Sequence, residues 1–399
     1  MQEKNRRAPK GHLRWVSSTV IVFACLGAAF YSLRIAYAEY LFRTDRPEAI
    51  ERAAALAPLR ADYQARLNRL DRAVKLNPYL ASAWIELGLR AEAAGDVVKA
   101  QASLRQAARV DRTFEPRWTL ANFYFRRGNW DEFWKWIRAA ADMSYGDRTG
   151  LFQLCWRATS DPQRILDRAI SPDRVLLADY VDYLARAQRY PAAQAAASRW
   201  LPLAVKDDTP ALLRLCDLLI ENAHDAGGAL CIWRTLIENG WLLFQPVDLN
   251  TGSVITNGTF RTPPLSHGFD WRTFSQPGVR VVSQQGLGII LDGHEEERTD
   301  LLIQWIPLRP STTYELTIKA RSDDIAAGSG LRLEILDGAF ATVLAKSEVS
   351  LPLSILRFET PPHALLGKLV LRYQRALGTS RLAGTVILSS IALVPLFHR

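Results

Sequence analysis

The sequence predicts three successive parts: an N-terminal transmembrane helix, an α-solenoid of helical repeats over residues 46–240 and a β-sandwich over residues 251–399. Three observations predict this order. An uncharged apolar run follows a basic N-terminus, a period of about 34 residues runs through the next part of the chain, and short alternating apolar segments follow residue 240. At 399 residues the chain exceeds what one hydrophobic core usually organises.

The composition indicates a mostly soluble body, with 48% hydrophobic and 23% charged residues. The formal net charge is +9, and much of the excess lies before the apolar run, at Lys4, Arg6, Arg7, Lys10 and Arg14. Elsewhere Lys and Arg are interleaved with Asp and Glu, so the charge pattern predicts no nucleic-acid partner.

The apolar run from Trp15 to Leu33 is long enough to span a bilayer. We expect residues 1–14 to be a cytoplasmic basic tail and residues 15–38 to be a transmembrane signal anchor, because the positive-inside rule keeps a basic flank in the cytoplasm. The bulk of the chain is then periplasmic or otherwise extracytoplasmic. A cleaved signal peptide is the competing interpretation, since Ala36-Tyr37-Ala38 is a small-x-small pattern. The length of the run and Arg34 favour the uncleaved anchor.

The repeats are clearest in the unit that begins at Ala81 and follows Asn77-Pro78. The small and large apolar positions of a helical hairpin fall on Trp84, Leu87, Gly88, Ala91, Gly95, Ala100, Leu104 and Ala107. This unit resembles the tetratricopeptide repeat (TPR). We expect about six such hairpins, and the resemblance implies a groove, lined by the first helix of each hairpin, that binds a protein partner.

The groove candidates are the positions that the repeat core does not use. They are Ser82, Ile85, Leu89, Glu92, Asn122, Phe125 and Arg126, together with Trp130 and Trp134 from an aromatic-rich stretch over 118–138. Packing against the irregular following repeat or the β domain is the alternative for these tryptophans, and it is favoured.

Four cysteines are present, without a CxxC pair, so a zinc site is not expected. Cys216 and Cys231 fall on adjacent helices expected to be antiparallel, where a disulfide is conceivable. Separately buried thiols are the slightly favoured alternative.

After residue 240 the sequence predicts eight to ten short strands, which indicates a β-sandwich. The expected strands are 254–260, 279–283, 288–291, 301–306, 314–320, 331–336, 356–359, 368–373 and 385–393, with one more near Val343.

This part resembles the galactose-binding-like jelly-roll carbohydrate-binding modules. The resemblance rests on Asn257-Gly258-Thr259-Phe260, on Gly268-Phe269-Asp270-Trp271 and on the segment 304–322. Many such modules hold a structural calcium ion near acidic residues. Here Phe260-Arg261 and the last strand lack carboxylates, so no metal is expected.

A sugar site needs an exposed aromatic platform with polar neighbours. The candidates for glycan binding are Asp270, Trp271, Arg372, Tyr373 and Arg375. Trp305 is expected to be a core residue, and Glu295-Glu296-Glu297 is expected to be a solvated loop.

No nucleophile elbow, zinc-protease motif, phosphate-binding loop or dinucleotide glycine pattern occurs, and the six histidines are scattered. We therefore expect neither a catalytic site nor a cofactor. The leading hypothesis is a non-enzymatic, membrane-anchored extracytoplasmic scaffold, with repeats that recruit a protein and a sandwich that contacts glycan in envelope or exopolysaccharide assembly or export. The main alternative is a purely protein-binding assembly factor whose sandwich caps the solenoid, and a secreted carbohydrate-active enzyme is less favoured.

Overall fold

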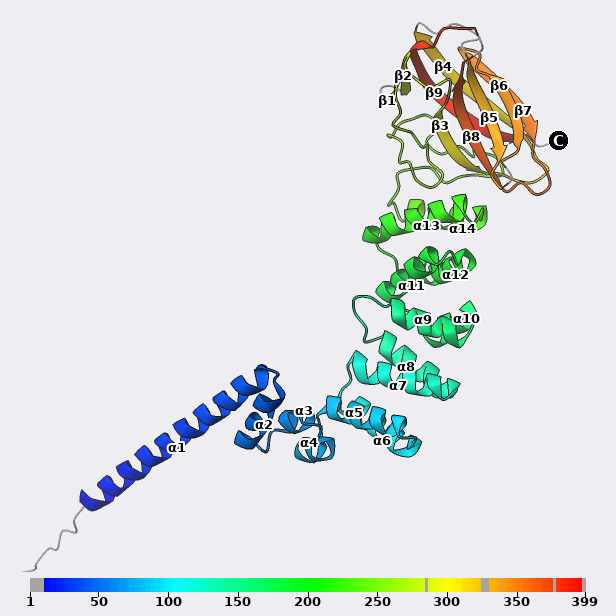
Figure 1. The fold of residues 1–399 in the computed structure, drawn as a ribbon. Helices are drawn as coiled ribbons and strands as arrows, with labels where there is room; N and C mark the ends of the chain where they lie inside the picture. Colours follow the sequence, from blue (N-terminus) through cyan, green and yellow to red (C-terminus); the bar gives the residue numbers. More distant parts are fainter. Residues whose placement is uncertain (1–10, 284–285, 324–329, 340, 376–377, 397–399) are drawn as a thin grey trace, which may run out of the picture. The chain divides into compact units, whose positions relative to one another are not determined.

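The computed structural model describes residues 11–283, 286–323, 330–339, 341–375 and 378–396 (Figure 1). Lys4, Arg6, Arg7 and Lys10, which carry the positive-inside argument, lie outside these ranges. The chain forms two compact units, Met1–Ser171 and Pro172–Arg399. The division falls inside the repeat array, so the last helical hairpins share a unit with the sandwich. The expected succession of an apolar N-terminal helix, helical repeats and a β-sandwich is confirmed.

The helices of the first unit are α1 (Gly11–Arg43), α2 (Pro47–Leu56), α3 (Ala61–Arg66), α4 (Leu70–Leu76), α5 (Ala81–Ala93), α6 (Val97–Val110), α7 (Phe114–Arg126), α8 (Trp130–Ala141), α9 (Thr149–Ala158) and α10 (Pro162–Arg168). The helices of the second unit are α11 (Arg174–Arg186), α12 (Tyr190–Trp200), α13 (Thr209–Glu221) and α14 (Ala226–Glu238), with short 3₁₀ turns η1 (Leu201–Leu203) and η2 (Lys206–Asp208). Helices α3 to α14 pair in order into six hairpins, as expected.

Helix α1 combines an exposed part and a packed part. Its segment Val20–Arg43 is the one described stretch of helix that is long and apolar enough to cross a membrane. From Val20 onward most of its apolar side chains are exposed, but Ala38 is fully buried and Leu41 is nearly so. Both pack against α2 and against Tyr63 of α3. The end of α1 therefore belongs to the packed helical array.

The repeat positions of the α5–α6 hairpin act as the sequence predicts. A Cβ atom at Gly88 would lie 2.5 Å from Cγ of Leu104, so only glycine allows this approach of the two helices. Gly95 turns the chain at φ +82°, and the Asp96 side chain then accepts the Lys99 N–H at the start of α6.

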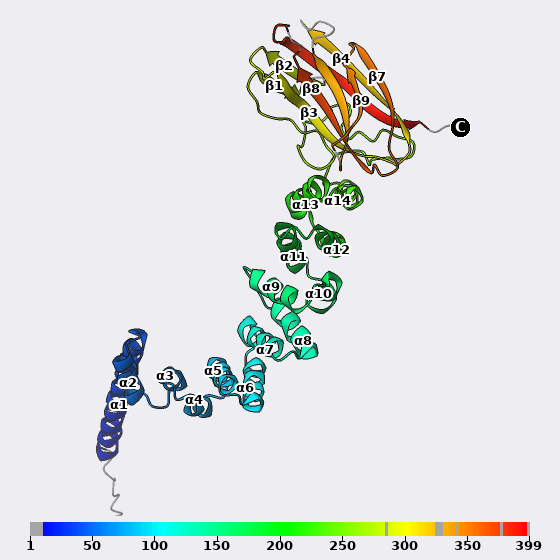
Figure 2. The same cartoon turned by 45° about the vertical axis from the view of Figure 1, so that its right-hand side comes forward.

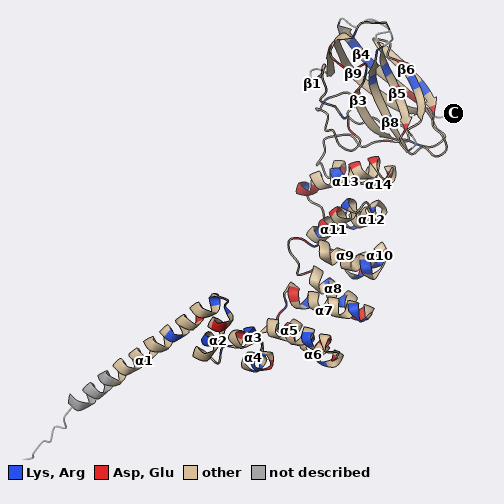
Figure 3. Cartoon of the chain, in the orientation of Figure 1, with Lys and Arg blue, Asp and Glu red and all other residues tan. Residues whose placement is uncertain are grey.

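The repeat period also appears in contacts between hairpins. Arg126 of α7 pairs with Glu92 of α5 at 2.6 Å, and these residues are 34 positions apart. Acidic and basic residues occur together on the hairpins of both units (Figure 3).

The sandwich consists of the strands β1 (Val279–Ser283), β2 (Leu287–Asp292), β3 (Arg298–Pro307), β4 (Thr313–Asp323), β5 (Leu331–Asp337), β6 (Val343–Glu348), β7 (Leu353–Glu359), β8 (Leu366–Gln374) and β9 (Ala383–Leu396). One sheet has the order β1-β2-β9-β4-β7 and the other β3-β8-β5-β6, with antiparallel neighbours throughout. The predicted strand 254–260 is wrong: it is an irregular segment with a turn at Thr256–Thr259. Asn257 has φ +51° and Phe260 φ +53°, which a strand does not accommodate.

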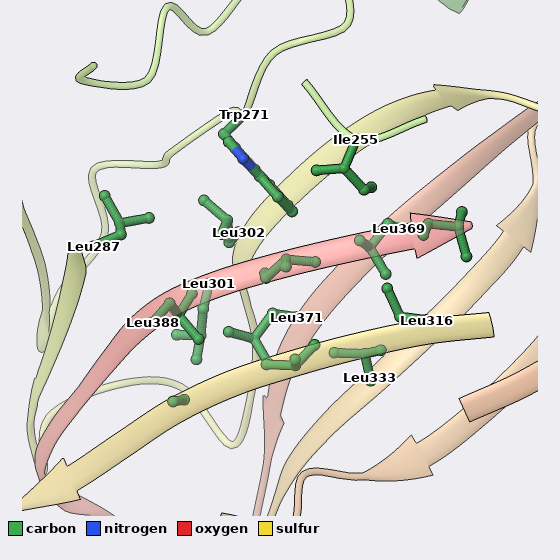
Figure 4. Close-up of a cluster of buried hydrophobic side chains, with 14 of the residues drawn as sticks. Ile255, Trp271, Leu287, Leu301, Leu302, Leu316, Leu333, Leu369, Leu371 and Leu388 are labelled. Atoms are coloured by element: carbon green, nitrogen blue, oxygen red, sulfur yellow. The ribbon is translucent and has the colours of Figure 1, made fainter. Parts of the chain in front are cut away.

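Leucines and isoleucines from both sheets fill the space between them, and Trp271 lies among them from the preceding loop (Figure 4). The tryptophan is 1% exposed, and its Nε1 donates to the carbonyl of Asn257. The irregular segment before β1 thus contributes side chains to the core of the sandwich.

Candidate partner-binding groove

A groove lies between the first helices of the last two hairpins, α11 and α13, with a volume of about 650 Å³. Its lining residues are Ala178, Asp179, Val181, Asp182, Ala185, Arg186, Gln188, Tyr190, Trp200, Ala211, Arg214, Leu215, Leu218 and Asn222. Val181, Trp200 and Leu215 are buried and form an apolar floor. The lining thus combines apolar and polar groups, as partner-binding sites do.

The charged groups of this groove differ in their pairing. Arg186 donates to Asp182 across one turn of α11, with an N–O separation of 2.5 Å. Asp179 has an interaction partner of its own. Arg214 of α13 is exposed and has no hydrogen-bond or ion-pair partner among the described residues.

The predicted groove residues of α5 and α7 have mixed positions. Ser82 and Leu89 are exposed, and Ser82 lines a hollow of about 610 Å³ beside α3. Ile85 is 7% exposed, so its prediction as a groove residue is wrong, because its side chain packs inside the array. Glu92 and Arg126 are joined in the ion pair between α5 and α7.

Asn122 is half-buried, and its amide donates to the carbonyl of Trp118 in the same helix. Phe125 is also half-buried, and its ring packs against Trp130 and Phe133. Neither side chain is therefore free to bind a partner without giving up these contacts.

The two tryptophans predicted to face a partner also differ. Trp130 is 41% exposed and packs edge-on against Phe125. Trp134 is 2% exposed, and Arg164 of α10 lies over its ring at 5.8 Å. The partner-facing prediction is wrong for Trp134, which packs against the following hairpin as the favoured alternative stated.

The glycan candidates do not form an exposed platform. Trp271 and Tyr373 are 1% and 0% exposed and belong to the core between the sheets, so the predicted platform is wrong. Asp270 is also fully buried. Its Oδ2 accepts the Leu265 N–H at 2.6 Å, whereas Oδ1 has no hydrogen-bond partner among the residues that the structure describes. Burial raises the pKa of Asp270 to about 6.

The two arginines among the candidates are held by ion pairs. Arg372 binds both Asp300 and Glu334 on the outer face of the four-stranded sheet, and Arg375 binds Glu297 at 2.5 Å. Glu295 is fully buried and accepts backbone N–H groups of Gly293 and Leu382, so the prediction of a solvated loop is wrong for this residue.

Trp305 is 9% exposed and lies opposite Lys368, whose Nζ is 5.4 Å from the ring centre. Its neighbour in the strand, Ile306, points into the core. Because side chains alternate along a strand, Trp305 points to the outer face and not into the inter-sheet core.

The α13–α14 hairpin docks directly on the loop that precedes β1 (Figure 2). Asp217 of α13 accepts three hydrogen bonds from this loop: His267 Nδ1 at 2.6 Å, the Gly268 N–H at 2.7 Å and Arg272 Nη2 at 2.7 Å. Beside them Trp233 of α14 packs edge-on against Phe269. Sequence reasoning missed this junction, because no local pattern relates residues 50 positions apart.

The cysteines on this hairpin are free thiols, with Cys216 buried and Cys231 exposed. The Cys216 Sγ lies 3.5 Å from the Ala229 carbonyl, and burial raises the pKa of its thiol. Within the part of the chain that the structure describes, no cluster of three metal-binding side chains occurs.

No protein-family model and no curated protein matches the chain. Solved structures are similar to separate parts of it. A CBM4 structure is 19% identical, with 36% of this chain and 99% of that chain covered, at a TM-score of 0.29. YrrB, described as a TPR protein with an unusual peptide-binding site, is 14% identical over 43% of this chain and 91% of that one, at a TM-score of 0.22. Yeast Tom70 is 16% identical over 57% of this chain and 56% of that one, at a TM-score of 0.28. At these identities the similarities concern the fold.

Proposed function

We propose that this chain is a non-enzymatic, membrane-anchored scaffold that binds a segment of a protein partner in the groove between α11 and α13, on the extracytoplasmic side of the membrane. The groove itself carries the proposal. It is formed by the first helices of consecutive hairpins, it is about 650 Å³ in volume, and it offers an apolar floor with polar walls.

The burial of Ala38 supports retention of the anchor. Cleavage after Ala38 would remove this buried residue from the cluster around Tyr63 and would cut α1 between its two buried residues, Ala38 and Leu41. It would also separate Glu39 from its helix, although Glu39 accepts a hydrogen bond from the Tyr63 hydroxyl at 2.9 Å. If α1 is not cleaved, its first part crosses the bilayer and its last turns pack against α2 and α3.

The junction at Asp217 supports a structural task for the sandwich. Three hydrogen bonds and the packing of Trp233 fix the last hairpin to it, so the sandwich covers an end of the array that would otherwise expose apolar surface. This favours the protein-binding assembly factor among the two functions that the sequence suggests.

Glycan contact during envelope or exopolysaccharide assembly is the second candidate function. The outer face of the sheet β3-β8-β5-β6 favours it, because Lys368, whose Nζ lies over the largely buried ring of Trp305, and the network of Asp300, Arg372 and Glu334 lie on this same face. Binding of the purified full-length protein to a glycan array tests this. We expect Trp305→Ala to remove any signal and Trp271→Phe to retain it, and a signal that survives Trp305→Ala contradicts this face.

Site-specific photocrosslinking in native membranes tests the protein-binding function. A photoreactive residue at Leu218, in the groove, is expected to form a single adduct of defined mass. The same residue at Ala195, on α12 and outside the groove, provides the matched control.

A groove-filling substitution completes this test. Ala178→Trp places an indole in the groove and is expected to abolish the adduct, whereas Ala195→Trp leaves it unchanged. Equal adducts from positions 218 and 195, or an adduct that persists in Ala178→Trp, would contradict the proposed groove.

A further inference from the structure

The groove between α11 and α13 has one unpaired charge. Of its four charged side chains, Arg186 and Asp182 form an ion pair and Asp179 has an interaction of its own, whereas the exposed guanidinium of Arg214 has no partner among the described residues. The guanidinium of Arg214 is therefore available to whatever binds in the groove.

The surroundings of Arg214 determine what can bind beside it. The neighbouring side chain in the helix, Leu215, is buried in the floor, and Leu218 stands one turn further along the same face. A protein segment that fills this floor also removes water from the guanidinium. A neutral or basic segment would leave that charge desolvated and uncompensated, whereas a carboxylate would pair with the planar fork of its N–H donors.

We infer that the partner segment is acidic: it places an aliphatic side chain on Val181, Leu215 and Leu218 and a carboxylate against Arg214. This inference rests on the proposed function, because it specifies which protein segment the groove accepts. The two acidic residues of the groove are already engaged, because Asp182 pairs with Arg186 and Asp179 has an interaction of its own. They therefore attract a basic segment less strongly than unpaired carboxylates would.

Selection of peptides from a random 12-residue phage library on the detergent-solubilised full-length protein tests the inference. We expect enriched sequences with Asp or Glu adjacent to Leu, Ile or Val. Their affinity should fall as salt is raised, because screening weakens a partly exposed ion pair.

Charge variants identify the residue responsible. Arg214→Glu is expected to weaken the selected peptides by about tenfold or more, since reversal replaces an attraction by a repulsion. Arg214→Gln should have a smaller effect of the same sign. Arg234→Glu on α14 is the matched control, because Arg234 is also exposed and unpaired among the described residues but lies outside the groove.

The outcomes separate the two proposals. Peptides that Ala178→Trp blocks, but that lack acidic residues or bind Arg214→Glu as well as the unchanged protein, overturn the acidic segment and leave the groove standing. Failure to enrich any peptide that Ala178→Trp blocks contradicts the groove itself. Unchanged circular dichroism and unfolding temperature of each variant show that the fold is intact.

Discussion

At the residue scale, burial reassigns several side chains that look like binding residues in the sequence. Tyr373 and Trp271 belong to the core between the sheets, and Asp270 is buried beside Trp271 in the loop that leads to it. A sugar site needs an aromatic residue next to a polar one. A buried loop can show the same pattern, because the aromatic side chain fills the core and the polar side chain accepts hydrogen bonds from backbone N–H groups of the loop. Asp270 shows the second use, because Oδ2 accepts the Leu265 N–H.

The first prediction concerns the pH dependence caused by Asp270. Burial raises its pKa to about 6, above the ordinary value of 3.8. The folded state then favours the protonated acid. The stabilisation of the folded state by this acid is complete below pH 4 and is lost as the pH rises through about 6, which lowers the free energy of unfolding by about 3 kcal/mol.

Asp270→Asn should remove this dependence, because the amide does not titrate. The difference in unfolding free energy between variant and unchanged protein, measured in urea from pH 4.5 to 7.5, should therefore change in favour of the variant as the pH rises. A difference that stays constant across this range contradicts the prediction.

The second prediction concerns the glycine at the junction. Gly268 has φ +57°, and a Cβ atom there would lie 2.4 Å from the Trp233 ring. We expect Gly268→Ala to destabilise the second unit by about 2 kcal/mol or more, since backbone strain and a clash add together. Gly240→Ala is the control: it has φ +69° and open space around it, so only the strain of about 1 kcal/mol applies. Equal unfolding free energies for the two variants would disprove the packing role.

At the element scale, α13 serves two interfaces with adjacent parts of its surface. Arg214, Leu215 and Leu218 line the groove, whereas Asp217 and Glu221 face Arg272 of the sandwich loop. The repeat period places α13 as the first helix of a hairpin. Its second interface depends on a loop that no repeat contains, so the period alone cannot predict it.

The third prediction tests helix pairing within a hairpin. Gly88→Ala should destabilise the first unit by about 1–3 kcal/mol, because the new methyl group overlaps Leu104 and separates α5 from α6. Gly150→Ala is the matched control on α9, where no atom lies within 4 Å of the added carbon. There alanine should stabilise by about 0.5–1 kcal/mol, since it lowers the backbone entropy lost on folding. Thermal unfolding of both variants measures these opposite signs, and a neutral Gly88→Ala contradicts the close approach.

At the scale of the whole molecule, the two compact units divide the chain inside the helical array. The change from helices to strands follows Glu238, as expected, but the units divide at Ser171. The physical reason in the second unit is the junction, since Asp217 and Trp233 give the last hairpin extensive contacts with the sandwich.

The fourth prediction tests how α1 joins the first unit. A chain that starts at Ile35 keeps Ala38, Leu41 and the packed end of α1, so we expect it to leave the membrane fraction and unfold like the full chain. A chain that starts at Thr44 loses these residues and should be destabilised by about 3 kcal/mol, since burial of one Leu alone contributes about 1.5–3 kcal/mol. Carbonate extraction and urea unfolding measure both properties, and equal stability of the two chains would show that α1 contributes nothing to the array.

The sequence by itself determined the succession of parts and the hairpin positions of residues 81–107. It also located eight of the nine strands to within a few residues and placed the ninth near Val343, but it predicted one further strand, 254–260, that does not form. These features depend on local periodicity, on glycine conformation and on caps such as Asp96, which residues close in sequence decide. Only the tertiary structure decided which side chains remain accessible. Trp134 and Trp271 are buried by elements distant in sequence, and Arg214 has no partner among the described residues, whereas Arg186 and Asp182 of the same groove pair with each other. The exposure of a side chain and its ion pairing depend on contacts with residues distant in sequence, so a local sequence pattern does not predict them.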